Sequence, residues 1–263
     1  LLGVILIMQK DSLQNLLILA KDIALTASNE ILNDFSQIRH VHENLCRDVK
    51  ILADNELDRF IVEQLSQKSG FPVLSEESGL SQASNSKINY RWIVDPLDGS
   101  MNFSREIPIC CISIAFWQDM VPLIGVVFDF NRDELFTGIV GEGAWLNDSP
   151  ICVSSTKHTS NAILATGFPV SSDFSQKTLY KFVNNIKIYQ KIRLLGSAAL
   201  SLAYVSCGRV DIYQENDIKI WDVAAGIALV RAAGGITHLT PSNVKEIVTV
   251  QAYNSNLKDK IYE

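Results

Sequence analysis

Two aspartates, Asp95 and Asp98, have the spacing in this sequence that is best suited to chemistry. They follow an apolar run over 91–94, and Pro96 and Gly99 favour a turn beside them. We therefore predict a short buried strand that ends at Pro96, with both carboxylates projecting from its end. Mg²⁺ commonly binds a couple of carboxylates together with phosphate oxygens. The alternative is a surface turn, because Asp, Pro and Gly also dominate turns for local backbone reasons.

Two further acidic segments favour the metal interpretation. Glu76 and Glu77 follow the apolar run over 71–74, at the end of another predicted strand. Asp222 stands where an apolar helix over 223–233 begins. Aspartate is a favoured N-cap and a helix N-terminus also attracts phosphate, so Asp222 alone is explained equally well as a cap.

In this order and at these separations, the motifs resemble the inositol monophosphatase family of Mg²⁺-dependent, lithium-sensitive phosphatases. The segments that carry the resemblance are S-E-E-S at 75–78, W-I-V-D-P-L-D-G-S-M-N-F at 92–103 and W-D-V-A-A-G at 221–226. The similarity extends from a helix near Asp11 to the glycines at 234–235, which is nearly the whole chain.

The resemblance implies the family's fold, a layered α-β-α-β-α sandwich with the site between its halves. We expect one phosphatase domain over 1–263. Its N-terminal α+β half, over 8–157, would hold the metal motifs, and its C-terminal α/β half, over 158–263, would supply the substrate contacts. Because members of the family commonly form homodimers, a homodimer is also expected.

The resemblance also implies a site with two or three Mg²⁺ ions. The first would be held by Glu76, Asp95 and the backbone carbonyl of Leu97. The second would be held by Asp95, Asp98 and Asp222, and a weaker third would also use Glu76. Divalent ions of this kind activate a water for in-line attack on phosphorus and stabilise the leaving oxygen.

Two further residues are implied to help Glu76 activate that water. In the family a threonine hydroxyl does so, and it is bonded to an aspartate from an upstream segment. This chain has Ser100 at the threonine position, which keeps the hydroxyl but loses the methyl that restricts the rotamer. Asp54 fills the upstream position, and its alternative role is a cap for the helix over 55–65.

The substrate contacts implied by the resemblance lie mainly in the second half of the chain. Glu215 stands where inositol phosphatases place a glutamate that accepts hydrogen bonds from ring hydroxyls. A carboxylate there suits a neutral polyol and repels a second phosphate. The alternative is a solvated loop acid. The complete implied set is Asp98, Gly99, Ser100, Gly196, Ser197, Ala198, Glu215 and Asp222.

The charge of the chain argues against nucleic acid as a partner. The formal net charge is −6 and basic residues are scattered, so we predict no direct binding to nucleic acid.

The 5 cysteines lack C-x-x-C spacing, which is typical of reduced, structural thiols in a cytoplasmic protein. We expect the adjacent Cys110 and Cys111 to serve packing. The apolar start over 1–8 is too short to cross a bilayer, and we expect Met8 to be the natural first residue.

The pattern of apolar and turn-forming residues along the chain predicts its helices and strands. Apolar residues at helical spacing predict helices over 11–32 and within 51–67. Strands dominate 73–153, including an antiparallel pair over 121–130 and 134–140. After Asn161 the chain alternates strand and helix, which indicates α/β layering.

We therefore predict a Mg²⁺-dependent phosphomonoesterase that acts on inositol monophosphate or a similar small polyol phosphate. The enzymatic alternatives are a 3′(2′),5′-bisphosphate nucleotidase acting on phosphoadenosine phosphate, a histidinol-phosphate phosphatase and a fructose-1,6-bisphosphate phosphatase. A non-catalytic alternative is a partner-binding component, since some bacterial relatives join nucleic-acid machinery through protein contacts.

Overall fold

The computed structural model describes residues 10–33, 41–45, 48–81, 90–168 and 174–257. The expected start at Met8 lies outside these residues. Within them the helices are α1 (Lys10–Asn33), α3 (Leu52–Ser69), α4 (Ser100–Ser104), α5 (Gln176–Ile186), α6 (Ala198–Ser206) and α7 (Ile220–Ala232), with a 3₁₀ turn η1 (Thr159–Asn161). In this described part of the chain, none of the helices combines the length and apolar character of a membrane span.

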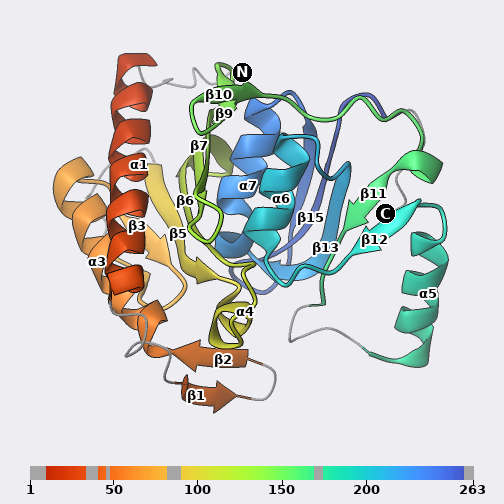
Figure 1. Ribbon diagram of the computed structural model, residues 1–263, viewed down its shortest axis with the longest axis horizontal. Helices are drawn as coiled ribbons and strands as arrows, with labels where there is room; N and C mark the ends of the chain where they lie inside the picture. The colour runs from red at the N-terminus through yellow and green to blue at the C-terminus, as the bar shows by residue number, and fades with distance from the viewer. Residues whose placement is uncertain (1–9, 34–40, 46–47, 82–89, 169–173, 258–263) are drawn as a thin grey trace.

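An eight-stranded sheet forms the centre of the first half of the chain (Figure 1). Its spatial order is β10-β9-β8-β7-β6-β5-β3-β4, and every neighbouring pair is antiparallel except β3 with β5. The strands are β3 (Val73–Ser75), β4 (Gly79–Leu80), β5 (Tyr90–Asp98), β6 (Cys111–Gln118), β7 (Val121–Asp129), β8 (Glu134–Ile139), β9 (Gly143–Leu146) and β10 (Ser149–Ile151). The antiparallel pair predicted over 121–130 and 134–140 is confirmed.

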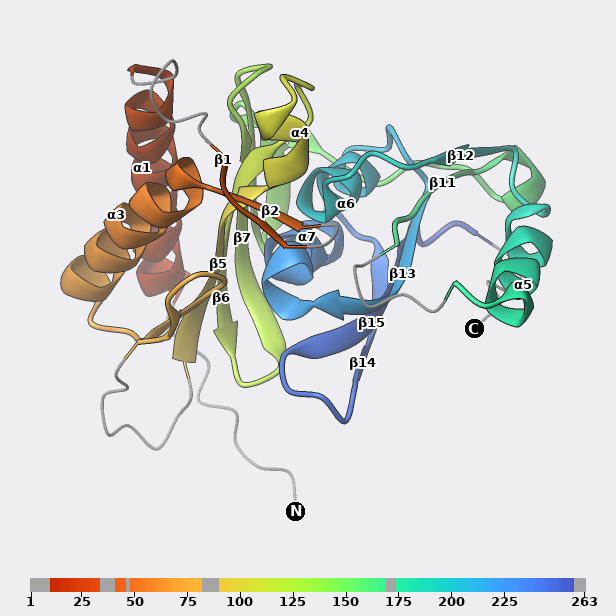
Figure 2. The ribbon, with the colours of Figure 1, turned by 90° about the horizontal axis from the view of Figure 1, so that it is seen from below.

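Both faces of this sheet are buried, which explains why its central strands are apolar throughout. Successive side chains of a strand point to opposite faces. Trp92 and Val94 of β5 therefore join a core with α1 and α3, whereas Ile93 joins a second core with α6 and α7. Figure 2 shows the sheet between these two helix layers.

A five-stranded sheet lies on the other side of α6 and α7, in the order β12-β11-β13-β15-β14. Helix α5 covers its outer face, where Ile186 packs against a small cluster that contains Leu164 and Ile212. The layers thus run α, β, α, β, α, which confirms the predicted sandwich. The strands are β11 (Ile163–Ala165), β12 (Lys191–Arg193), β13 (Ile212–Lys219), β14 (Ile236–Pro241) and β15 (Ile247–Tyr253), and a separate hairpin pairs β1 (Val41–Leu45) with β2 (Asp48–Ile51).

Helix α7 approaches the eight-stranded sheet closely at a pair of glycines. Gly125 of β7 and Gly138 of β8 are opposite each other in the strand register. A Cβ added to Gly125 would lie 2.3 Å from the carbonyl oxygen of Ala225 in α7. A Cβ added to Gly138 would lie 2.9 Å from the Cβ of Ala232. The glycines therefore set how near the helix that carries Asp222 comes to the sheet that carries Asp95.

We predict that Gly125→Ala lowers the free energy of unfolding by about 1–3 kcal/mol, the range typical of overpacked cores. The new methyl group meets a backbone oxygen, so the whole helix must shift. Gly138→Ala is the matched control and should cost less, because its methyl group overlaps less, at 2.9 Å from the nearest atom instead of 2.3 Å. Chemical denaturation of the variants measures both values. A larger cost for Gly138→Ala would contradict this account of the packing.

Candidate active site

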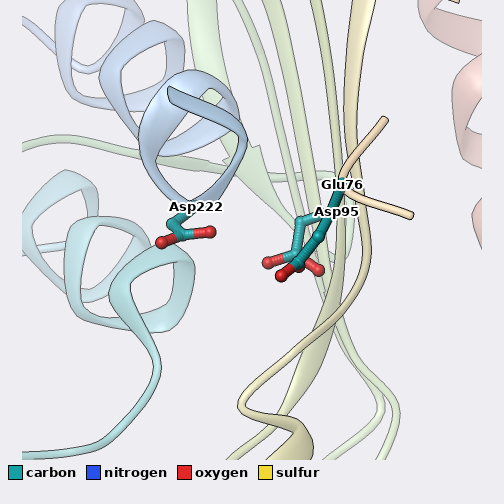
Figure 3. A group of neighbouring side chains, drawn as sticks. All are labelled: Glu76, Asp95 and Asp222. Atoms are coloured by element: carbon teal, nitrogen blue, oxygen red, sulfur yellow. The ribbon is translucent and has the colours of Figure 1, made fainter. Parts of the chain in front are cut away.

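Three carboxylates from distant parts of the chain meet between the eight-stranded sheet and α7. Because β3 and β5 are parallel, with Ser75 opposite Val94, the next residue after β3 lies beside Asp95. That residue is Glu76, whose N–H donates to the carbonyl oxygen of Val94 at 3.3 Å. Figure 3 shows Asp222 facing Glu76 and Asp95 from the start of α7. Carboxylate oxygens of the three residues lie within 4.8 Å of one another.

The strand that carries Asp95 is longer than predicted. We expected it to end at Pro96, but β5 continues through Pro96 to Asp98, so this prediction was wrong. The register shifts between Asp95 and Asp98, and a bulge of this kind accommodates a proline, which has no N–H for the ladder. Oδ1 of Asp95 instead accepts the N–H of Leu97 at 3.0 Å. Both aspartates are consequently buried rather than exposed on a turn.

The electrostatics of Asp95 favour a cation at this position. Burial is the first cause that raises the pKa of Asp95 well above its usual value, and the negative charges of Glu76, Asp98, Asp222 and Asp54 add to it. Like charges in a low-dielectric interior oppose one another. A bound divalent cation offsets this repulsion between the carboxylates, since it is the largest local charge in such a site. The donor set of oxygens is also the one that Mg²⁺ prefers, so the residues present fit the expected metal.

Two of the predicted acids, Asp54 and Asp222, lie in the first turns of helices. Helix α3 begins at Leu52, so Asp54 lies inside its first turn instead of capping a helix that starts at 55. Helix α7 has Lys219 as its N-cap, which makes the cap interpretation of Asp222 wrong. A helix N-terminus stabilises negative charge. Both positions therefore stabilise a carboxylate whose charge acts on Asp95.

Asp98 connects the metal motif to the start of α6. Its Oδ2 accepts the hydroxyl of Ser197 at 2.5 Å and the N–H of Ala199 at 2.8 Å. Burial raises the pKa of Asp98 to about 6, although these hydrogen bonds lower it. Cys111 lies in the same contact, with its Sγ 3.8 Å from Oδ2. Cys111 is part of the hydrophobic core, as its predicted packing role requires, and the fold also brings its thiol to Asp98.

The turn after Asp98 depends on glycine and on one amide. Gly99 has φ of 86°, and a Cβ there would lie 2.7 Å from a backbone carbonyl oxygen, so only glycine fits. Ser100 begins α4 directly after it. Nδ2 of Asn102 donates to the carbonyl oxygen of Leu195 at 2.9 Å. This bond holds α4 against the loop at Gly196. We did not predict a role for Asn102, although it belongs to the recognised motif.

Asp58 is a second residue that the sequence interpretation missed. It is buried and accepts the hydroxyl of Ser75, and it also accepts hydrogen bonds from Ser78. Burial is the main cause that raises its pKa. These bonds hold the turn on both sides of Glu76. The available signal was its position 4 residues after Asp54, which places both acids on one face of α3.

A pocket of about 200 Å³ lies beside the carboxylates. Glu215 lies on its wall and belongs to β13, with 8% of its surface exposed, so the loop-acid interpretation is wrong. Burial raises the pKa of Glu215 to about 7, despite a hydrogen bond from Tyr213. The pocket is lined by Asp98, Thr166, Gly167, Phe168, Gly196, Ser197, Ala198, Ser201, Glu215, Ile218 and Asp222.

Most of the predicted substrate residues lie on the wall of this pocket. Asp98, Gly196, Ser197, Ala198, Glu215 and Asp222 line the pocket, whereas Gly99 and Ser100 are not among the lining residues. Gly167 belongs to the segment A-T-G-F-P at 165–169, which resembles a segment near the pocket in bacterial members of the family, although the sequence interpretation did not select it as a site residue. Ser201 was not selected, because nothing in its local sequence separates it from ordinary helix residues.

Comparison with known proteins decides the family. The family model described as "Inositol monophosphatase family" matches residues 12–261. The chain belongs to the inositol monophosphatase family. It is therefore a phosphoric monoester hydrolase, as its relatives named inositol-1-monophosphatase are.

Relatives of this phosphatase carry two kinds of name. An inositol-1-monophosphatase from Synechocystis is 37% identical, over 85% of this chain and 78% of the relative. A Nus factor SuhB from Xylella fastidiosa is 40% identical, over 81% of this chain and 77% of the relative. Among solved structures, the inositol monophosphatase from Anabaena (Nostoc) is 34% identical with a TM-score of 0.80, covering 93% of this chain and 92% of that one. The extragenic suppressor protein suhB from Bartonella henselae is 32% identical with a TM-score of 0.81, covering 92% and 95%.

We predict that Glu215→Gln changes how the stability of the metal-free phosphatase depends on pH. The pKa of Glu215 is about 7 in the folded protein, against a usual 4.5, so its neutral form favours folding. That contribution is complete below the usual pKa and is lost as pH rises through about 7. The variant does not titrate there. Relative to wild type, it should gain roughly 3 kcal/mol of unfolding free energy between pH of about 4 and about 8.

Urea unfolding in a chelator at a series of pH values measures this difference. Glu56→Gln, an exposed glutamate of α3, is the control and should follow wild type throughout. A constant difference between Glu215→Gln and wild type across this range would rule out the raised pKa.

Proposed function

We propose that this protein is a Mg²⁺-dependent phosphomonoesterase that hydrolyses inositol monophosphate or a similar small polyol phosphate. The observation that carries the proposal is the position of Asp222, which belongs both to the carboxylate cluster and to the pocket wall. A phosphate in this pocket would lie beside the cluster, and the rest of the substrate would face Glu215. The family supports the same chemistry.

The residues that would hold the metal are Glu76, Asp95 and Asp222, whose oxygens already converge. We propose that Asp98 and the carbonyl of Leu97 complete a set for two or three ions, as the resemblance implies. When bound, Mg²⁺ supplies activation of the attacking water and stabilisation of the leaving oxygen.

Three side chains of the protein would prepare that water. We propose that Glu76 accepts its proton, helped by the hydroxyl of Ser100, with Asp54 orienting that hydroxyl. Asp54 is buried at the start of α3, and its charge acts on Asp95. Ser100 begins the helix after the metal motif. Each of the three therefore comes from an element that ends or begins at the cluster.

The pocket favours a substrate with hydroxyl groups. Glu215 offers a carboxylate acceptor from β13, and Gly196, Ser197 and Ala198 line the wall at the start of α6. A second phosphate beside Glu215 would meet its negative charge, which favours a polyol phosphate over a nucleoside bisphosphate. From the resemblance we also propose a homodimer in the cytoplasm, without direct binding to nucleic acid.

A partner-binding role is the second candidate, because a relative that is 40% identical is named a Nus factor. A pulldown with wild type and with Asp98→Asn separates the two roles. A partner retained by an inactive variant supports this second role, whereas a protein without any stable partner does not have it.

We predict that inositol-1-phosphate is the preferred substrate in a panel with phosphoadenosine phosphate, fructose bisphosphate and histidinol phosphate. Release of inorganic phosphate should require Mg²⁺ and stop with chelator, because the cluster supplies only anionic oxygens. Colorimetric phosphate assays measure each rate. A preference for another substrate would overturn the role of Glu215, and no release with any substrate would favour the partner-binding role.

We predict that Asp95→Asn lowers kcat/KM by at least about 1000-fold, which corresponds to several kcal/mol of lost transition-state stabilisation. Asp95 is the buried member of the cluster and is proposed to bridge the first two ions, so loss of its charge weakens both of those metal positions. Asp119→Asn is the control, since Asp119 is exposed and asparagine tolerates its positive φ of 52°. Near-normal turnover by a folded Asp95→Asn protein would refute the proposed bridging role.

A further inference from the structure

The carboxylate of Glu215 is held from one side by a buried tyrosine. Tyr213 and Glu215 are two residues apart on β13, so their side chains point to the same face. The hydroxyl of Tyr213 donates to Oε2 of Glu215 at 2.8 Å. Burial, followed by the charge of Glu215, raises the pKa of Tyr213 well above its usual value. The tyrosine therefore remains a protonated donor at neutral pH.

Gly167 holds the same carboxylate from another side. A Cβ added to Gly167 would lie 2.5 Å from Oε2 and 2.7 Å from Oε1 of Glu215. The carboxylate therefore rests directly on the backbone of the loop after β11. This close approach is possible only because residue 167 has no side chain.

The two contacts restrict Glu215 in complementary ways. Oε2 is engaged by Tyr213, so Oε1 is the oxygen with more acceptor capacity for a ligand. Glu215 and Gly167 line the pocket, whereas Tyr213 is fully buried behind them and is not among the lining residues. A free glutamate side chain loses rotamer entropy when a ligand fixes it. Here that ordering precedes binding, which is how preorganisation increases affinity.

We propose that Tyr213 is a positioning residue that, together with Gly167, fixes Glu215 as an acceptor for a substrate hydroxyl and so sets the preference for polyol phosphates. This inference rests on the proposed function and names the residues that determine its specificity. Tyr213 acts through Glu215 and does not touch the substrate.

The test compares Tyr213→Phe with wild type on two substrates, inositol-1-phosphate and phenyl phosphate, which has no hydroxyl group for Glu215. With Mg²⁺ present, KM for inositol-1-phosphate should rise about tenfold, the size expected when one hydrogen bond to a charged group loses its geometry. The kcat and KM for phenyl phosphate should stay within about twofold of wild type, since the metal cluster does not involve Tyr213. Equal changes for both substrates, or none, would overturn the proposal.

Two further variants make the result specific. Tyr253→Phe is the matched control. The Tyr253 hydroxyl lies 3.0 Å from Nε2 of His238 in the same sheet, and Tyr253 is not among the residues that line the pocket. It should leave both substrates unchanged. Gly167→Ala disturbs the second contact of the carboxylate and should also raise KM for inositol-1-phosphate.

A crystal structure of the Tyr213→Phe protein separates this inference from the proposed function. We expect the Glu215 carboxylate to leave its contact with Gly167, whatever the substrate is. An unmoved carboxylate would overturn the positioning role. If wild type instead shows no preference for inositol-1-phosphate over phenyl phosphate, the proposed function fails, and the crystal structure still decides whether Tyr213 positions Glu215.

Discussion

The mutual repulsion of the carboxylates gathered around the buried Asp95 is the constraint on which the rest of this structure depends. Glu76, Asp95 and Asp222 meet within 4.8 Å, and the pKa of Asp95 is raised by burial and by its neighbours. Groups of one charge approach a buried carboxylate this closely only where other interactions hold them or a cation neutralises them. The fold supplies the first condition, because each acid comes from a rigid element: the end of β3, the centre of β5 and the start of α7. The expected metal would supply the second condition, the neutralising cation.

The same requirement explains the contacts around the cluster. Asp58 holds the turn of Glu76 from α3, and Gly125 admits α7 close to the sheet that carries Asp95. Asp98 accepts hydrogen bonds from the N-terminus of α6, 101 residues further along the chain. The acidic site therefore lies where these contacts hold the two sheets against the helix layer between them. Stability and chemistry depend here on the same hydrogen bonds, so variants in this region need folding controls.

The pocket follows a different principle from the cluster. On its wall, away from the cluster, the carboxylate of Glu215 is held by Tyr213 and lies against the backbone of Gly167. In the proposed function, this ordered acceptor would distinguish ligands by where their hydroxyl groups lie, whereas the cluster would recognise the phosphate that all candidate substrates share. Substrate choice and phosphate chemistry would then belong to separate parts of one site.

The sequence by itself determined the family and, through it, the layered fold, because Asp95, Asp98 and Asp222 stand in motifs whose order and spacing are specific. Local pattern also located most helices and the β7–β8 hairpin, since apolar periodicity reflects which face is buried. It placed the end of β5 wrongly, because a bulge that admits Pro96 depends on the neighbouring strand β6. It did not select Asp58, Asn102 or Tyr213, because their roles depend on hydrogen bonds that follow from packing and burial. Only the tertiary structure decided these roles, because a hydrogen bond between distant residues is fixed by how helices and sheets pack and leaves no periodic signal in the chain.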